Sequence, residues 1–257
     1  MAKCNLNKVL WFGDKPEPPP KPWYYLKLSP TLGSFRPFGI PVKELCERTH
    51  ASDAFRQECN ALVLTAPPNI KQVLAHYGVV TFPVHDIFES LDFSDYGGPR
   101  GHGDRYKWPT ISGLCKQEGH VLVLTEYVER DGYKYKADNR QGVFNHEMAH
   151  CFDHALGHIS QQPEFLACVE ADVARIRAKL SPGQQAVLHY FLADAPQGPS
   201  EIFAECLAAN LNLCAVAYWT KDMCDWFPQS YEFVSRLAQL PDAKLIAISS
   251  EGRKTTP

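Results

Sequence analysis

Two histidines and a glutamate stand close together in the run N-H-E-M-A-H, residues 145–150. On a helix, His146 and His150 project from one face, where two imidazoles can bind a single tetrahedral zinc ion. Glu147 directly follows the first histidine, so its carboxylate lies beside the open position of the metal and can take a proton from bound water. The pattern therefore predicts a zinc-dependent hydrolase in which Glu147 acts as the base.

The sequence around this motif predicts the helix that must carry it. Apolar residues recur throughout Val143–Leu156, which favours a buried helix. Two histidines on an exposed helix are the alternative interpretation, but burial without partners is costly, and a metal ion supplies partners. His154 and His158 continue the same face by further turns of about 5.4 Å. We interpret both as surface or capping residues; the alternative for His154 is a contact with the substrate or with a residue that supports the metal ligands.

A third ligand must come from further along the chain. The metzincin pattern needs a glycine and a histidine at positions that hold Asp153 and Leu156, which excludes that class. Glu170 and Glu201 are the carboxylate candidates. Glu201 is favoured because Glu205 stands four residues later on a predicted apolar helix, so that one carboxylate can bind zinc while the other accepts a hydrogen bond from a ligand histidine. Glu170 is better explained as part of a solvated helix face.

The pattern along the chain predicts an α+β fold, with a small sheet first and a mostly helical C-terminal half. We expect strands at Ala61–Thr65, Val79–Val84, His120–Tyr127 and Tyr133–Tyr135. We expect helices at Val42–Glu58, Asn69–Tyr77, Val143–Leu156, Pro163–Leu180, Pro182–Leu192, Pro199–Leu213 and Ser230–Gln239. Residues 94–108 contain several glycines and are expected to form a long loop.

Three regions are predicted from the composition along the chain. Residues 1–58 form an N-terminal extension whose run K-P-E-P-P-P-K-P, Lys15–Pro22, predicts a polyproline arm. Residues 59–245 form the metallopeptidase-like domain and residues 246–257 a tail.

Charge and composition exclude several classes of partner. The net charge of −3 and the lack of a long basic run argue against nucleic acid and anionic membranes as partners. No apolar stretch approaches the roughly 20 residues that span a bilayer. The segment Met1–Trp11 lacks the apolar run of a signal peptide, so we expect a cytoplasmic protein or one exported by a non-classical route. Nine cysteines without a C-x-x-C pair indicate reduced thiols rather than a disulfide framework.

Several motifs together are similar to one known family. The most specific are H-E-M-A-H-C-F-D at His146–Asp153 and S-E-I-F-A-E-C-L at Ser200–Leu207. Weaker matches lie upstream, at Asn69–Val79, Pro99–Asp104 and Ile111–Leu114. In these motifs the chain resembles, over about Ala61–Leu240, the catalytic domain of anthrax lethal factor and its relatives, the lethal-factor-like gluzincins. The resemblance implies a zincin-like fold, with an edge strand above a zinc cleft.

The resemblance also implies roles for individual residues. Glu201 would be the third ligand of a single zinc ion, with Glu205 supporting a ligand histidine. The strand Gly119–Glu126 would be the upper rim of the cleft, where an extended peptide pairs as an additional strand. Its substrate-binding residues would then be His120, Val121, Leu122 and Val123.

A tyrosine shortly before the helix of the third ligand would donate to the oxyanion in this family. This chain departs from that pattern, because Asp194 occupies the region and the nearest tyrosine is Tyr190, eleven residues before Glu201. Tyr190 reaches the site only if the intervening loop folds back, and its neighbour His189 is another candidate.

The activity that the resemblance implies is that of a zinc-dependent endopeptidase, acting on an extended peptide or protein. A toxin or effector role follows from the family alone, and the residues themselves do not indicate it. Two alternatives stay open: a module of the same fold that binds zinc and peptides without turnover, and a metal-dependent hydrolase of another substrate. Nothing in the sequence predicts the oligomeric state.

Overall fold

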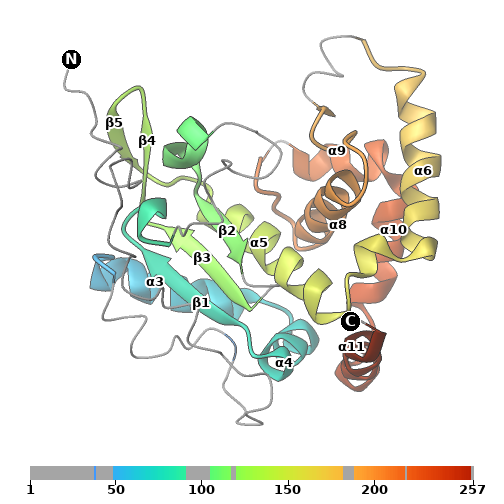
Figure 1. Cartoon of the computed structure of the whole chain (residues 1–257), viewed down its shortest axis with the longest axis horizontal. Helices are drawn as coiled ribbons and strands as arrows, with labels where there is room; N and C mark the ends of the chain where they lie inside the picture. Colours follow the sequence, from blue (N-terminus) through green and yellow to red (C-terminus); the bar gives the residue numbers. More distant parts are fainter. Residues whose placement is uncertain are drawn as a thin grey trace, which may run out of the picture.

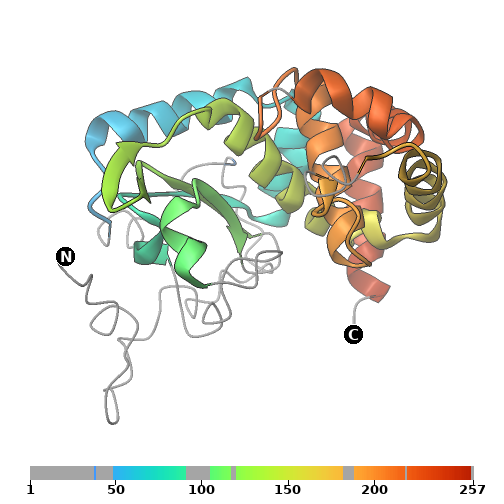
Figure 2. The same ribbon diagram turned by 90° about the horizontal axis from the view of Figure 1, so that it is seen from above.

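The computed structural model describes residues 38, 49–90, 105–116, 120–181, 188–217 and 219–255. Within these ranges a small sheet with helices α3 (Asp53–Thr65) and α4 (Pro68–Tyr77) forms one half, and a group of helices forms the other. Figure 1 and Figure 2 both show α5 (Arg140–Ala155) between the two halves. The predicted α+β arrangement, with a small mixed sheet followed by a largely helical C-terminal half, is confirmed.

The main sheet has three strands in the order β1-β3-β2. Strand β1 (Val80–Val84) pairs with β3 (Val121–Thr125) in parallel, and β2 (Gly113–Lys116) pairs with β3 in antiparallel orientation. Strands β4 (Tyr127–Arg130) and β5 (Tyr133–Lys136) form a separate hairpin. Its turn residues Asp131 and Gly132 both have positive φ angles, of 53° and 79°.

The two faces of the sheet are covered by different elements. Leu122 and Leu124 of β3 belong to the large core that α3, α4 and α5 share. Val121 and Val123 point to the opposite face and pack with Trp108 in a second, smaller core. That face is covered by two short 3-10 helices, η2 (Ile87–Ser90) and η4 (Arg105–Thr110). The strand is therefore buried on both faces, as its uninterrupted apolar sequence predicts.

The helical half is built around α8 (Gln197–Asn210), which is buried over almost its whole length and packs directly on α5. Around it lie η5 (Ile159–Gln161), α6 (Pro163–Arg177), α9 (Trp219–Trp226) and α10 (Pro228–Ala238). Helix α11 (Asp242–Thr255) packs on α4. Fully buried aromatic rings fill the spaces between these helices: Phe152, Phe165, Phe191, Phe203 and Phe227. None of the described helices combines the length and the apolar character that crossing a bilayer requires.

The prediction of a strand at Ala61–Thr65 is wrong, because these residues form the last turns of α3. The buried positions of α3, Phe55, Cys59, Leu62 and Val63, follow the three- and four-residue spacing of a helix. A short apolar run fits either structure, and the spacing over the longer segment decides. Helix α4 ends at Gly78, whose φ angle of 88° lies in the region that favours glycine.

The prediction that β3 is the edge strand is wrong as well. β3 lies between β1 and β2, so the backbone groups of Val121, Leu122 and Val123 are already paired on both sides. His120, just before it, stacks on Tyr77 at a ring distance of 4.2 Å. Among the described residues β1 and β2 are the outer strands, and the one beside α5 is β2, a four-residue segment that carries a glycine and therefore has a weak strand signal.

Several predicted features lie outside the described residues. These are the proline-rich arm Lys15–Pro22, residues 94–104 of the predicted loop, residues 182–187 of a predicted helix and the last two residues of the tail. The domain boundaries stay a prediction.

Candidate metal centre

Helix α5 is fixed in place by the segment that follows α8. The Asn139 side chain donates to the carbonyl oxygens of Cys214 and Ala215, at 2.8 and 2.6 Å. Asn145, one turn into the helix, donates to the Leu213 carbonyl at 3.0 Å. Gly142 lies so close that a Cβ atom there would be 2.0 Å from the Cys214 carbonyl oxygen. The histidines of α5 are thereby held at a defined position relative to the glutamates of α8.

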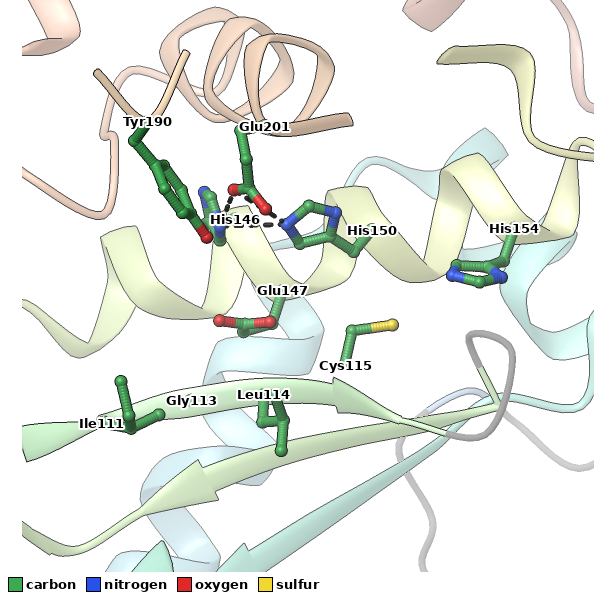
Figure 3. Close-up of a pocket in the computed structure, with 10 residues that line it drawn as sticks. All are labelled: Ile111, Gly113, Leu114, Cys115, His146, Glu147, His150, His154, Tyr190 and Glu201. Atoms are coloured by element: carbon green, nitrogen blue, oxygen red, sulfur yellow. Dashed lines mark hydrogen bonds and ion pairs between the residues drawn. The ribbon is translucent and has the colours of Figure 1, made fainter. Parts of the chain in front are cut away.

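Three side chains of these two helices converge on one point (Figure 3). The Nε2 atoms of His146 and His150 are 3.1 Å apart. Glu201 Oε2 lies 3.3 Å from the first nitrogen and 3.4 Å from the second. A tetrahedral zinc ion with bonds of about 2.0–2.1 Å places its ligand atoms about 3.3 Å from one another. The three separations therefore match one face of a zinc tetrahedron.

The hydrogen bonding of Glu201 supports the same conclusion. Its side chain is buried, with 2% of the residue exposed, and its Oε2 atom has no hydrogen-bond partner among the described residues. Two imidazole nitrogens lie 3.3 and 3.4 Å from this oxygen and attract its charge, but neither contact has the geometry of a hydrogen bond. A buried carboxylate oxygen in this state is costly unless a cation lies between the three atoms. The group of His146, His150 and Glu201 can thus hold a metal ion, and its donor set suits zinc.

The Nδ1 atoms of His146 and His150, which face away from the shared point, each lie near a polar side chain. His146 Nδ1 lies 3.1 Å from Oε1 of the buried Glu205, whose other oxygen accepts from the Ala215 backbone N–H at 3.3 Å. His150 Nδ1 lies 3.3 Å from Ser200 Oγ. Such contacts orient the imidazoles, so that each ring turns its Nε2 atom toward the shared point.

Charges at the centre shift the pKa values of its groups. Burial lowers the pKa of His146, but the carboxylates of Glu205 and Glu201 outweigh it and raise that pKa well above its ordinary value. Burial raises the pKa of Glu201, yet the nearby His150 and His146 lower it far more. Without a metal ion, therefore, the histidine protons stabilise the buried carboxylates. A bound cation would take over that role, because an imidazole nitrogen binds a metal ion only in its deprotonated form.

Glu147 points from α5 toward β2, on the open side of the metal group (Figure 3). Burial raises its pKa, while His146, His150 and a hydrogen bond from the Cys115 backbone N–H partly oppose that shift. A carboxylate with a raised pKa is a better base near neutral pH than an exposed one. Its position between the metal group and the sheet edge is the position that the sequence motif predicts for the base.

A pocket opens beside the metal group and is bounded by α5 and β2 (Figure 3). Its lining residues are Ile111, Gly113, Leu114, Cys115, His146, Glu147, His150, His154, Tyr190 and Glu201. Its rim is therefore β2, and the residues His120–Val123 of the sequence-based prediction do not line it in the described part of the chain.

Within the described residues, strand β2 directs some of its backbone groups away from β3, toward the side of the pocket. The Ser112 carbonyl accepts from the Thr125 N–H at 3.0 Å, which identifies these two as a hydrogen-bonded pair of the antiparallel ladder. Such pairs alternate with non-bonded ones, so Gly113 and Cys115 direct their N–H and C=O groups away from β3. A Cβ atom on Gly113 would lie 2.9 Å from Glu147 Cγ, and only glycine lets the strand come this close.

The structure brings Tyr190 into the pocket, where its hydroxyl end points toward the metal group (Figure 3). Its neighbour His189 is exposed. His154 lines the other end of the pocket and stacks edge-on against His158, with ring centroids 4.4 Å apart. Glu170, the alternative third ligand, is exposed on α6 and does not join the group.

Sequence reasoning missed Ser200 and the roles of Gly113 and Cys115. Ser200 directly precedes Glu201 in the first turn of α8. That position is the one feature of the sequence that places its hydroxyl near the metal group. Gly113 lies in Ile111–Leu114, which the sequence indicates only as a weak match to the family. The strand β2 could be identified only from its pairing with β3.

Comparison with known proteins gives one structural match. The chain is similar to the Pro-Pro endopeptidase PPEP-2 from Paenibacillus alvei, with a TM-score of 0.45 and 23% identity, over 75% of this chain and 98% of that one. No protein-family model and no curated protein matches the chain. The chemistry of this site must therefore be argued from its own residues.

Proposed function

We propose that this chain is a zinc-dependent endopeptidase that cleaves an extended segment of a peptide or protein. One observation carries the proposal: the three metal-binding atoms of His146, His150 and Glu201 converge beside Glu147 at the open edge of a sheet. A purely structural zinc site has no use for a buried carboxylate directed at its open side, nor for a pocket at that side.

His146, His150 and Glu201 would hold the ion. When bound, zinc would supply Lewis-acid chemistry, polarising the scissile carbonyl and lowering the pKa of a water molecule. Glu147 accepts the proton of that water and later delivers it to the leaving amine.

Tyr190 is proposed to donate its hydroxyl to the oxyanion that develops at the scissile carbonyl. The support is its place in the lining of the pocket, across from Glu147. A donor that meets the carbonyl oxygen only in the transition state lowers the barrier without tightening substrate binding.

The substrate is proposed to pair with β2 as an additional strand. Gly113 and Cys115 direct backbone groups into the pocket, and the ladder geometry leaves those groups available to another chain. Gly113 is proposed as the main pairing residue, because it lines the pocket beside Glu147 and has no side chain of its own. An extended main chain beside β2 would pass directly below the metal group, which favours a peptide over other substrates.

The test compares the wild type with Glu147→Gln in two measurements, zinc content and cleavage of a peptide library. We expect about one zinc ion per chain in both proteins, because Glu147 is not among the three metal-binding residues. Cleavage in the variant should fall by about 10²- to 10⁴-fold, the usual contribution of a general base.

Glu170→Gln, which changes an exposed glutamate of the helical half, is the matched control and should retain both properties. If the wild-type protein binds zinc but cleaves no library member at high enzyme concentration, the endopeptidase proposal fails.

A further inference from the structure

Two thiols meet between the edge strand and the metal-binding helix. The Sγ atoms of Cys115 on β2 and Cys151 on α5 are 3.5 Å apart, and both cysteines are free. Cys115 is half-buried and lines the pocket, whereas Cys151 is fully buried and directly follows His150. The proposed reaction uses neither sulfur atom.

The placement of the pair follows from how the strand and helix pack. Side chains alternate along a strand, so Gly113 and Cys115 both face α5. At Gly113 the contact is so close that a Cβ atom would lie 2.5 Å from Val143 Cγ1. The Cys115 side chain points toward α5 (Figure 3). There it meets Cys151, which lies one helical turn after Glu147. A disulfide has an S–S length of about 2.05 Å, so the sulfur atoms need to approach by only about 1.5 Å.

We propose that Cys115 and Cys151 form a reversible disulfide that ties the edge strand β2 to the metal-binding helix α5. Hydrogen peroxide is the oxidant to which this site would respond, since a small molecule can enter the pocket and reach Cys115.

The chemistry balances with peroxide as the oxidant. The Cys115 sulfur attacks one peroxide oxygen, the O–O bond breaks, and a sulfenic acid forms with release of one water molecule. The Cys151 sulfur then attacks the sulfenic sulfur, forming the S–S bond and releasing the second water. In total, the two thiols give up two electrons and two protons, and peroxide is reduced to two water molecules. A dithiol such as dithiothreitol reverses the reaction.

The bond would join the two sides of the proposed substrate cleft. Cys115 lies with Glu147 in the lining of the pocket, and Cys151 is adjacent to a metal-binding histidine. Pulling β2 toward α5 narrows the space in which a substrate strand must lie. We therefore expect the oxidised form to cleave peptides more slowly; this consequence rests on the proposed function, whereas formation of the bond does not.

The experiment uses the full chain, reduced and loaded with zinc. One sample is treated with hydrogen peroxide and another is left reduced; remaining thiols are blocked with N-ethylmaleimide, and peptides are mapped by mass spectrometry without reduction. We expect a linked peptide pair containing Cys115 and Cys151, two hydrogen atoms lighter than the free pair, which disappears after dithiothreitol. Peptide cleavage should fall severalfold on oxidation and recover on reduction.

Cys115→Ser and Cys151→Ala should each lack both the linked pair and the reversible fall in cleavage; two variants are used because the buried Cys151 position tolerates change less well. Cys168→Ser removes a half-buried thiol of α6 and should behave like the wild type.

The absence of a linked pair in the wild-type protein would overturn the proposal. A linked pair with unchanged cleavage would show that the disulfide forms but does not narrow the cleft. A reduced protein that cleaves nothing contradicts only the proposed function, because the linked pair is detected independently.

Discussion

His146 Nδ1 lies 3.1 Å from Glu205 Oε1, so the ring can turn only its Nε2 atom toward the metal group. Glu205 is itself held by the Ala215 backbone N–H and is almost fully buried. A buried carboxylate in this place orients the imidazole and makes it a stronger donor to a metal ion. We therefore expect the metal affinity of this site to depend on a residue that is not among the three that can bind the ion.

Replacing Glu205 by alanine should lower zinc affinity by about 10- to 100-fold, because His146 loses the group that orients it. Competition with a chromophoric chelator would measure the change. Glu232→Ala, at an exposed glutamate of α10, should leave the affinity unaltered. Equal affinities for the wild type and Glu205→Ala would show that the contact has no influence on the metal.

Glu201→Ala should abolish stoichiometric zinc binding, since two histidines alone do not complete a three-ligand catalytic site. Elemental analysis after gel filtration would give the zinc content per chain. Glu170→Ala should retain its zinc, because Glu170 is exposed on α6. The reverse result would make Glu170 the third ligand and refute the assignment of Glu201.

Tyr190→Phe should lower kcat by about 10²- to 10³-fold with little change in KM, as expected when one oxyanion donor is removed. Steady-state kinetics on a cleaved library peptide would separate the two constants. Tyr133→Phe, on the exposed hairpin strand β5, is the control and should retain wild-type kinetics. A rise in KM at constant kcat would instead place Tyr190 in substrate binding.

Gly113→Ala should destabilise the fold by about 1–3 kcal/mol, because the added Cβ overlaps Val143 and Glu147. It should also lower kcat/KM, since the edge strand and the base are displaced together. Chemical denaturation and cleavage assays measure the two effects. Gly132→Ala has free space around it but a φ angle of 79°, so it should cost about 1 kcal/mol and leave cleavage intact.

The lowered pKa of Glu126 predicts that this residue stabilises the fold in a pH-dependent way. Burial raises its pKa, but hydrogen bonds from the Ser52 N–H and hydroxyl, at 2.8 and 2.7 Å, and the charges of His85 and Arg140 lower it overall. A lowered folded-state pKa means that this stabilisation is complete above the ordinary pKa of 4.5. It is lost as the pH falls through the folded-state pKa.

Glu126→Gln should therefore be less stable than the wild type by about 1–3 kcal/mol at neutral pH. The difference should shrink as the pH is lowered below the ordinary pKa of the carboxyl group. Urea denaturation at several pH values between neutral and acidic would measure it. A difference that is independent of pH would show that the charge of Glu126 does not contribute.

How far the sequence predicts the structure differs between the two halves of the site. The spacing of His146, Glu147 and His150 requires only one regular helix, so their relative placement follows from local geometry. Glu201 could be favoured over Glu170 because Glu205 accompanies it on the same helix. The strands could not be predicted as well from the sequence: Ala61–Thr65 is helical, and the pattern does not indicate the edge strand β2.

By itself the sequence determined the chemistry: which residues can bind a metal ion, which carboxylate can act as a base, and that a helix carries them. Those properties depend on side-chain types and on spacing within a single element. The tertiary structure alone decided that β2 rather than β3 borders the cleft, that Tyr190 reaches the pocket, and that Cys115 meets Cys151. These are contacts between elements far apart in the chain, and they follow from strand order and helix packing, which no local pattern specifies.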